Sequence, residues 1–311
     1  MIKIGYLNWN GENEMARNIM SSFKEKASEY NVEVIEKDAQ NNEKTQWDQS
    51  LELIDGGAKV LVIKPVNTVL AADIVRYAHK KGVIVIANDQ LIKNCPLDYY
   101  VTFDSRKVGE AMATEAIRSK PKGTYVIFSG DKSDDNADLV KEGVYKILQP
   151  EISNGNIKVL YSSYIEAWSL ENAVNTMDMI VNLSGNKPVD AVIAASDDMA
   201  RGAIQVLENE NMLEQTYISG QNADIESLKS IANNKQTITL AKSPKTLGYA
   251  LAELAVKVAT GNNKINIQVN GETPNGFQNV PSVLFDPVVV NKTNIDQFVA
   301  NSGYLKKEVL E

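Results

Sequence analysis

Two compact polar clusters lie between residues 189 and 228, and each follows a short apolar run. Ser196-Asp197-Asp198 comes after the first run, and Gln221-Asn222-Ala223-Asp224 comes after the second. Their carboxylates and carboxamides can exchange hydrogen bonds with the hydroxyl groups of a neutral ligand. Neither cluster contains a histidine or a glycine-rich phosphate loop. The pattern therefore favours recognition without chemistry, with Asp197 and Asn222 as the predicted contacts.

Other candidate ligand residues also follow apolar runs. The Asp89 carboxylate, directly after the run 83–87, could accept hydrogen bonds from two hydroxyls of a sugar. A turn or helix cap without a ligand is the alternative at that position. Trp9 and Trp168 could stack on a pyranose, although loop packing is the alternative for each. The remaining candidates are Asn10, Gln90, Asn136 at an expected helix start, and Lys242 on an extended segment.

The sequence offers only weak patterns for metal binding or catalysis. A calcium-loop match over residues 131–142 has Asn136 in place of the turn glycine. A single histidine, His79, excludes a histidine-based metal site or triad. Asp197 and Asp198 are adjacent, so we expect one to face the ligand and the other to cap the following helix. We expect no catalytic residue, no metal site and no cofactor.

These candidates belong to an alternation of strand-like apolar runs and amphipathic helix-length segments. The expected strands cover residues 3–8, 32–38, 60–64, 83–87, 124–128, 158–162, 189–195 and 216–219. The expected helices cover residues 12–30, 45–55 and 71–81, and others begin near residues 136 and 170 and after each of the two polar clusters. Such alternation is typical of parallel sheets covered by helices, with ligands bound at the carboxyl ends of the strands.

About ten expected strands are too many for one comfortable sheet. A break near residues 103–106 and extended segments at 237–242 and 283–290 indicate an α/β chain with two Rossmann-like lobes joined by three hinge crossings. We assign residues 1–105 plus 243–285 to the first lobe and residues 106–242 plus 286–311 to the second. A cleft between such lobes would close on a ligand.

Bulk composition narrows the range of partners. The chain has 311 residues and a formal net charge of −8, so binding to a nucleic-acid backbone is disfavoured. No apolar run is long enough to span a bilayer, and the first residues read as a core strand and not as a signal peptide. The chain is therefore expected to be either cytosolic or the mature part of an exported protein. The single Cys95 fits either compartment.

Colinear motifs along the whole chain carry a resemblance to a known family. They include the segments 42–46, 60–65, 103–104, 107–110, 134–137, 171–173, 218–221 and 275–282, together with Trp168 and Lys242. On these residues the chain resembles the bacterial type I periplasmic sugar-binding proteins, and among them the D-xylose binders. The resemblance implies a sugar held between the two lobes, stacked on Trp168. It also implies hydrogen bonds from Asp89, Asn136, Asp197, Asn222 and Lys242.

The chain departs from that family pattern at the predicted site. Met15 and Gln90 stand where xylose binders place arginines, and Asp197 and Asn222 have exchanged identities. Loss of two guanidinium groups is expected to change the affinity or the pentose that fits.

The resemblance implies an extracytoplasmic, non-enzymatic binding protein for a pentose, with D-xylose as the leading ligand. A membrane partner would read the closed form, and it could be an ABC permease or a sensor histidine kinase. The alternative is the effector-binding domain of a lactose-repressor-type transcription factor, which would carry a helix-turn-helix ahead of the first strand. No such segment precedes Met1 in this sequence.

Overall fold

The computed structural model describes residues 1–185, 187–302 and 305, and the chain divides into two compact units. Unit 1 comprises Met1–Phe103 and Ser243–Phe285, and unit 2 comprises Asp104–Lys242 and Asp286–Glu311. The chain therefore passes from one unit to the other at three places. The predicted boundaries lie after residues 105, 242 and 285.

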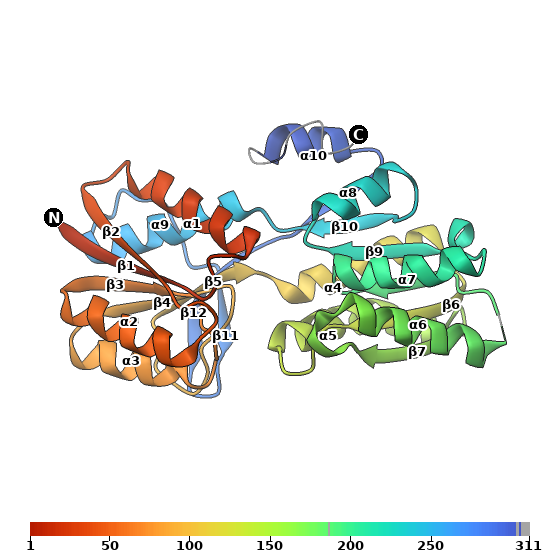
Figure 1. Ribbon diagram of the computed structural model, residues 1–311, viewed down its shortest axis with the longest axis horizontal. Coiled ribbons are helices and arrows are strands. Elements are labelled where there is room, and N and C mark those ends of the chain that lie inside the picture. Colours follow the sequence, from red (N-terminus) through yellow and green to blue (C-terminus); the bar gives the residue numbers. More distant parts are fainter. Residues whose placement is uncertain (186, 303–304, 306–311) are drawn as a thin grey trace. The chain divides into compact units, whose positions relative to one another are not determined.

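Unit 1 contains, within the described residues, a seven-stranded sheet with the order β11-β12-β5-β4-β3-β1-β2 (Figure 1). Its strands are β1 (Ile2–Asn8), β2 (Val32–Asp38), β3 (Ala58–Ile63), β4 (Ile84–Asn88), β5 (Tyr99–Phe103), β11 (Gly271–Pro274) and β12 (Asn279–Phe285). Its helices are α1 (Glu14–Ala27), α2 (Glu43–Asp55), α3 (Ala71–Lys80) and α9 (Pro244–Thr260). Strands β1 to β5 and β12 pair in parallel, and the edge strand β11 pairs antiparallel with β12.

Helices cover both faces of this sheet. Successive side chains of a strand point to opposite faces, so alternate residues pack against different helices. In β3, Val60 and Val62 pack with residues of α1 and α9, whereas Leu61 and Ile63 pack with residues of α2 and α3. Strands buried on both faces read as continuous apolar runs, which explains why the central strands could be predicted. Their polar residues are then concentrated where each strand ends.

Unit 2 contains, within the described residues, a six-stranded sheet with the order β13-β10-β9-β8-β6-β7. Its strands are β6 (Gly123–Ser129), β7 (Ile157–Tyr164), β8 (Ala191–Ala194), β9 (Tyr217–Gln221), β10 (Ile238–Ala241) and β13 (Val288–Asn291). Its helices are α4 (Ser105–Ser119), α5 (Asp135–Ser153), α6 (Leu170–Ser184), α7 (Asp197–Asn209), α8 (Ile225–Ala232) and α10 (Ile295–Ser302), with short 3-10 turns η1 (Glu166–Trp168) and η2 (Leu213–Gln215). The edge strand β13 pairs antiparallel with β10, and the other pairings are parallel.

Most helices begin on a side chain that accepts a hydrogen bond from the first turn. The caps are Asn13, Asn42, Asp104, Asp134, Ser169, Ser196, Asp224 and Ser243. Each satisfies a backbone N–H that the helix itself leaves without a partner. Polar residues at the carboxyl ends of the strands therefore serve the fold as well as any ligand.

The structure differs from the sequence prediction at several elements. Strand β5 and helix α4 occupy the region where a break was expected near residues 103–106, and a helix that was not predicted, α9, begins at Pro244. Proline is favoured at this first helical position, since its missing N–H has no partner there in any case. The extended segment expected at 283–290 is two strands, because β12 ends at Phe285 in the sheet of unit 1 and β13 begins at Val288 in that of unit 2.

Candidate functional site

In unit 1, three neighbouring strands bring polar and aromatic side chains to one edge of the sheet. Trp9 follows β1, Lys64 follows β3 and Asp89 follows β4, and these parallel strands are adjacent in the sheet. The Lys64 ammonium lies 2.6 Å from Asp89 Oδ2 and 5.3 Å from the centroid of the Trp9 ring. The structure thus joins two predicted residues, Trp9 and Asp89, through a lysine that the sequence did not single out. Its one signal was a cation at the end of an apolar strand.

The two other candidates of unit 1 lie in the same loops. The Asn10 side-chain oxygen accepts a hydrogen bond from the Glu12 N–H at 2.9 Å and so shapes the loop that leads into α1. Gln90 follows Asp89, and its backbone N–H donates to the carbonyl of Asn88 in a tight turn. Asn10 therefore stabilises the loop before α1. Gln90 is next to Asp89 in the chain and stays a candidate ligand residue.

In unit 2, Trp168 lies directly against the backbone of Gly130, which follows β6. A Cβ atom at residue 130 would stand 2.0 Å from the indole, so only glycine fits beneath the ring. Ala167 and Trp168 both have positive φ angles in the short turn after β7. The Asp131 carboxylate accepts hydrogen bonds from Ser133 and from the Ala167 N–H, and these bonds lower its pKa. The indole is therefore held in place by its own turn.

Asn136 lies in the first turn of α5, as predicted, and Asp134 caps that helix. The Asn136 side-chain oxygen accepts a hydrogen bond from the Ser105 hydroxyl at 2.9 Å, which ties the starts of α4 and α5 together. Its side chain is partly exposed, and the amide nitrogen is the group that remains suited to a ligand acceptor.

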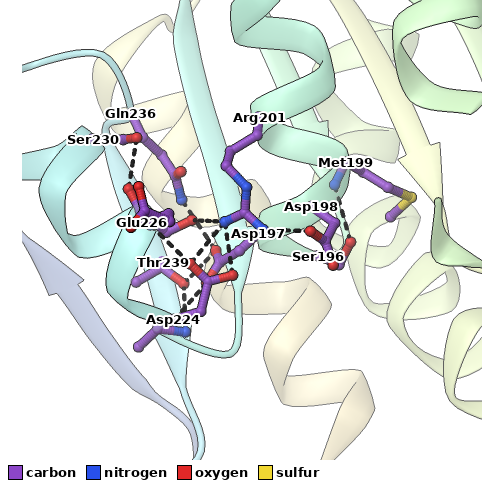
Figure 2. A network of polar contacts seen from close by, with 12 residues as sticks. Ser196, Asp197, Asp198, Met199, Arg201, Asp224, Glu226, Ser230, Gln236 and Thr239 are labelled. Carbon is purple, nitrogen blue, oxygen red and sulfur yellow. Dashed lines mark hydrogen bonds and ion pairs between the residues drawn. The ribbon is translucent and has the colours of Figure 1, made fainter. Parts of the chain in front are cut away.

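The structure corrects the expectation for Asp197. Its side chain is only 1% exposed, and its carboxylate accepts hydrogen bonds from Thr239 Oγ1 at 2.8 Å and Gln236 Nε2 at 3.2 Å (Figure 2). The Asp224 N–H donates to the other oxygen at 3.0 Å. A Cβ atom at Gly220 would meet the same carboxylate at 2.1 Å. Asp197 is therefore enclosed by the chain and joins the ends of β8, β9 and β10.

The expected helix cap is also different. Ser196 caps α7 by accepting a hydrogen bond from the Met199 N–H, whereas Asp197 and Asp198 are the first helical residues. Asp198 is exposed and pairs with Arg201, whose guanidinium also binds Asp224 at 2.7 Å (Figure 2). Serine is as good an N-cap as aspartate, so the cluster alone did not decide which side chain would serve.

Asn222 and Lys242 follow two adjacent strands of the unit 2 sheet. Asn222 comes after β9, has an exposed side chain and adopts a φ angle of 108°, and the next residue, Ala223, also has a positive φ. Such backbone is costly for residues other than glycine and persists only where the surroundings enforce it. Lys242 comes after β10 and is partly exposed. Both residues therefore lie at the edge where the fold class binds ligands.

A separate groove lies elsewhere on unit 1, and its volume is about 350 Å³. It is lined by residues of α2, α3 and the loop before α3, among them Trp47, Leu70 and Ile74, and contains none of the predicted ligand residues. In the part of the chain that the structure describes, no cluster of His, Cys, Asp and Glu side chains has the size and spacing of a metal site.

Comparisons with known proteins agree with this arrangement of strands and edges. A family profile described as a periplasmic binding protein domain matches residues 4–263. The chain belongs to this family. Among the residues that the structure describes, no helix is both long enough and apolar enough to cross a membrane.

Two named proteins and one solved structure illustrate what this chain is similar to. The D-xylose-binding periplasmic protein of Haemophilus influenzae is 38% identical over 286 residues, which cover 92% of this chain and 85% of that protein. The protein of the same description from Escherichia coli is 36% identical and covers 93% and 86%. An ABC transporter solute-binding protein from Clostridium phytofermentans, solved with bound β-D-glucose, superposes with a TM-score of 0.87 at 27% identity, covering 99% of this chain and all of that one.

Proposed function

We propose that this chain is an extracytoplasmic binding protein for a monosaccharide, with a pentose of the D-xylose type as its ligand. The observation that carries the proposal is the edge formed by Trp9, Lys64 and Asp89 in a chain whose relatives are named as D-xylose-binding proteins. An aromatic face beside a hydrogen-bonding acceptor and donor suits a sugar, which has an apolar C–H surface and a rim of hydroxyls.

In unit 2, the proposed ligand residues are Trp168, Asn136, Asn222 and Lys242, which follow β7, β6, β9 and β10. These strand ends combine an aromatic face, amide groups and an ammonium. Asp197 is not retained among them, because its carboxylate is enclosed by three donors of the chain itself. Nothing in this set resembles a nucleophile paired with a base, so we propose binding without turnover.

Calorimetry against D-xylose, L-arabinose, D-ribose and D-glucose tests the proposal. We expect D-xylose to bind most tightly, and we expect the sugar to be recovered unchanged after long incubation. The matched variants are Asp89→Ala at the unit 1 edge and Asp55→Ala, an exposed aspartate at the end of α2. Absence of binding to every sugar would overturn the proposal, and so would equal binding by both variants.

The membrane partner is proposed from the similar solved structure named above, which is an ABC transporter solute-binding protein. We propose that the sugar-bound chain is recognised either by an ABC permease or by a sensor histidine kinase. Reconstitution with each partner separates them. The first predicts sugar-dependent stimulation of ATP hydrolysis by the permease, and the second predicts sugar-dependent autophosphorylation of the kinase.

A further inference from the structure

Lys64 lies between two of the unit 1 residues that the sequence assigned to the ligand, Trp9 and Asp89. Its ammonium is 2.6 Å from Asp89 Oδ2 and 5.3 Å from the Trp9 ring centroid. The Lys64 and Asp89 side chains are 14% and 24% exposed, so the pair is largely shielded from water and not fully enclosed. An ion pair so placed is screened less by water than a surface pair, so each charge determines the field that a ligand meets.

The backbone on both sides of the pair is fixed by side chains of the same unit. Gln46, which is buried, donates from Nε2 to the Lys64 carbonyl at 2.9 Å and accepts from the Val66 N–H at 2.8 Å. Asp89 has a positive φ of 64°, and its carbonyl accepts a hydrogen bond from the Tyr100 hydroxyl at 2.8 Å. The pair is therefore formed by the fold and does not need a ligand to assemble it.

We propose that Lys64 is a specificity residue of the sugar site: its ammonium cancels the charge of Asp89 at the unit 1 edge, so that this edge accepts uncharged polyols and rejects cationic sugars. The proposal rests on the proposed sugar-binding function. Asp89 contributes acceptor oxygens and Lys64 contributes donor hydrogens, so together they match a hydroxyl group, which needs one of each. A protonated amine in place of that hydroxyl would meet the Lys64 ammonium and be repelled.

The test compares affinities for a neutral sugar and for its amino-deoxy derivatives, which carry the amine at successive carbons and are protonated at about pH 6. The measured quantity is the ratio of the derivative's Kd to the parent's Kd. In Lys64→Met the Asp89 carboxylate loses the ammonium that lies 2.6 Å from it, so this ratio should fall at least about tenfold for one or more derivatives. A general loss of fold would weaken both ligands alike and leave the ratio unchanged.

The chain provides a matched control for this substitution. Lys81 pairs with Asp55 at 2.9 Å and lies 5.3 Å from the Tyr77 ring, the same combination of groups on the exposed surface after α3. Lys81→Met should leave the ratio within about twofold of the wild-type value, because an exposed pair is largely screened. Lys64→Arg keeps the cation and should behave like the wild type. Lys64→Gln replaces the methionine variant if that variant does not fold.

The double variant Lys64→Met, Asp89→Asn isolates the charge. The gain for amines should disappear, since the negative charge that attracted them has been removed. If the ratio does not move in Lys64→Met or Lys64→Gln, or if it still moves in the double variant, the proposal is wrong although the protein binds sugar. If the wild-type chain binds no neutral sugar, the proposed function itself is wrong and the role of Lys64 falls with it.

Discussion

Asp89 in unit 1 and Asp197 in unit 2 occupy the same kind of position, the first turn after a buried parallel strand. Their surroundings differ. Asp89 is partly exposed and has a lysine ammonium beside it, whereas Asp197 is 1% exposed and accepts hydrogen bonds from two neutral side chains and a backbone N–H. The Asp197 oxygens accept three hydrogen bonds from the chain, and at 1% exposure their remaining acceptor capacity is closed off from a ligand.

The comparison shows that a carboxylate at a strand end can bind a ligand only if hydrogen bonds from the chain itself do not already enclose it. In unit 2 the Asp197 carboxylate accepts hydrogen bonds from residues in or next to β9 and β10, and Asn222 and Lys242 follow these two strands. In unit 1 the fold holds the backbone of Asp89 and leaves its carboxylate beside Lys64. The predictions below test whether this division of tasks is correct.

The largest expected effect is on ligand affinity at Asp89. Asp89→Asn should weaken binding of the preferred sugar by about 100-fold, because it removes a charged acceptor and leaves Lys64 without its counter-ion. The same change at the other carboxylate, Asp197→Asn, should alter affinity by less than about tenfold. Calorimetry on both variants measures the difference. Equal losses would contradict the division of tasks, and a larger loss at Asp197 would reverse it.

The next effect is on stability, where we expect Asp197 to matter far more than its exposed neighbour Asp198. Asp197→Ala leaves the Thr239 hydroxyl, the Asp224 N–H and one hydrogen of the Gln236 amide without their acceptor, although the amide still donates to the Ile238 carbonyl. The change should cost about 3 kcal/mol in the free energy of unfolding. Asp198→Ala, the neighbouring position, removes an ion pair from a side chain that is 57% exposed and should cost less than about 1 kcal/mol. Urea unfolding of both variants provides the measurement. A cost at Asp197 as small as that at Asp198 would show that the network is not a stabilising one.

Some strands could be predicted from the sequence and others could not, because only some of them form a continuous apolar run. The α/β class and most of the strands were predictable because strands buried on both faces are continuous apolar runs, as in β3 and β4. Strand β5 was missed because Tyr99-Tyr100-Val101-Thr102-Phe103 contains hydroxyl groups and runs at once into helix α4. The internal strand β12 and the edge strand β13 were merged because only two residues separate them, and no local pattern shows that they belong to different sheets.

The candidate site was predictable in position and less so in detail. Strand ends identified where Asp89, Asn136, Asn222 and Lys242 would lie, since ligands bind at that edge of parallel sheets. The enclosure of Asp197 depends on Gln236 and Thr239, which are about forty residues away in the chain, and no local pattern reveals such a partner. Lys64 was missed for the same reason, because its meaning comes from Asp89 and Trp9 on neighbouring strands.

A smaller effect should follow from moving the indole of Trp168 without removing it. Gly130→Ala places a methyl group where the ring now lies, 2.0 Å from its nearest carbon, so the ring must shift. If Trp168 stacks on the sugar, affinity should fall by about tenfold, as in Trp168→Ala. Gly155→Ala is the control, because no atom lies within 4 Å of its added carbon, although its positive φ carries a modest strain. Unchanged binding in Gly130→Ala and Trp168→Ala would assign this tryptophan to packing alone.

The smallest effect is on the pH dependence of stability, and it concerns Asp197. Burial, followed by the negative charge of Asp224, raises the pKa of Asp197 to about 7, although three hydrogen bonds act in the opposite direction. A carboxyl whose pKa is higher in the folded state than in the unfolded chain binds its proton more tightly when folded, so its contribution to stability is present below about pH 4 and is lost as the pH rises to about 7.

The stability difference between the wild type and Asp197→Asn, which cannot titrate, should therefore shift against the wild type by more than about 1 kcal/mol between pH 4.5 and pH 8. Arg201 bonds to Asp224 and partly offsets its charge, so Arg201→Met should strengthen the dependence by exposing Asp197 to the full repulsion of Asp224. Urea unfolding across the pH range measures both changes. A difference that stays constant with pH would mean that the three donors keep Asp197 ionised throughout, and its role would then be that of a fixed charge within the network.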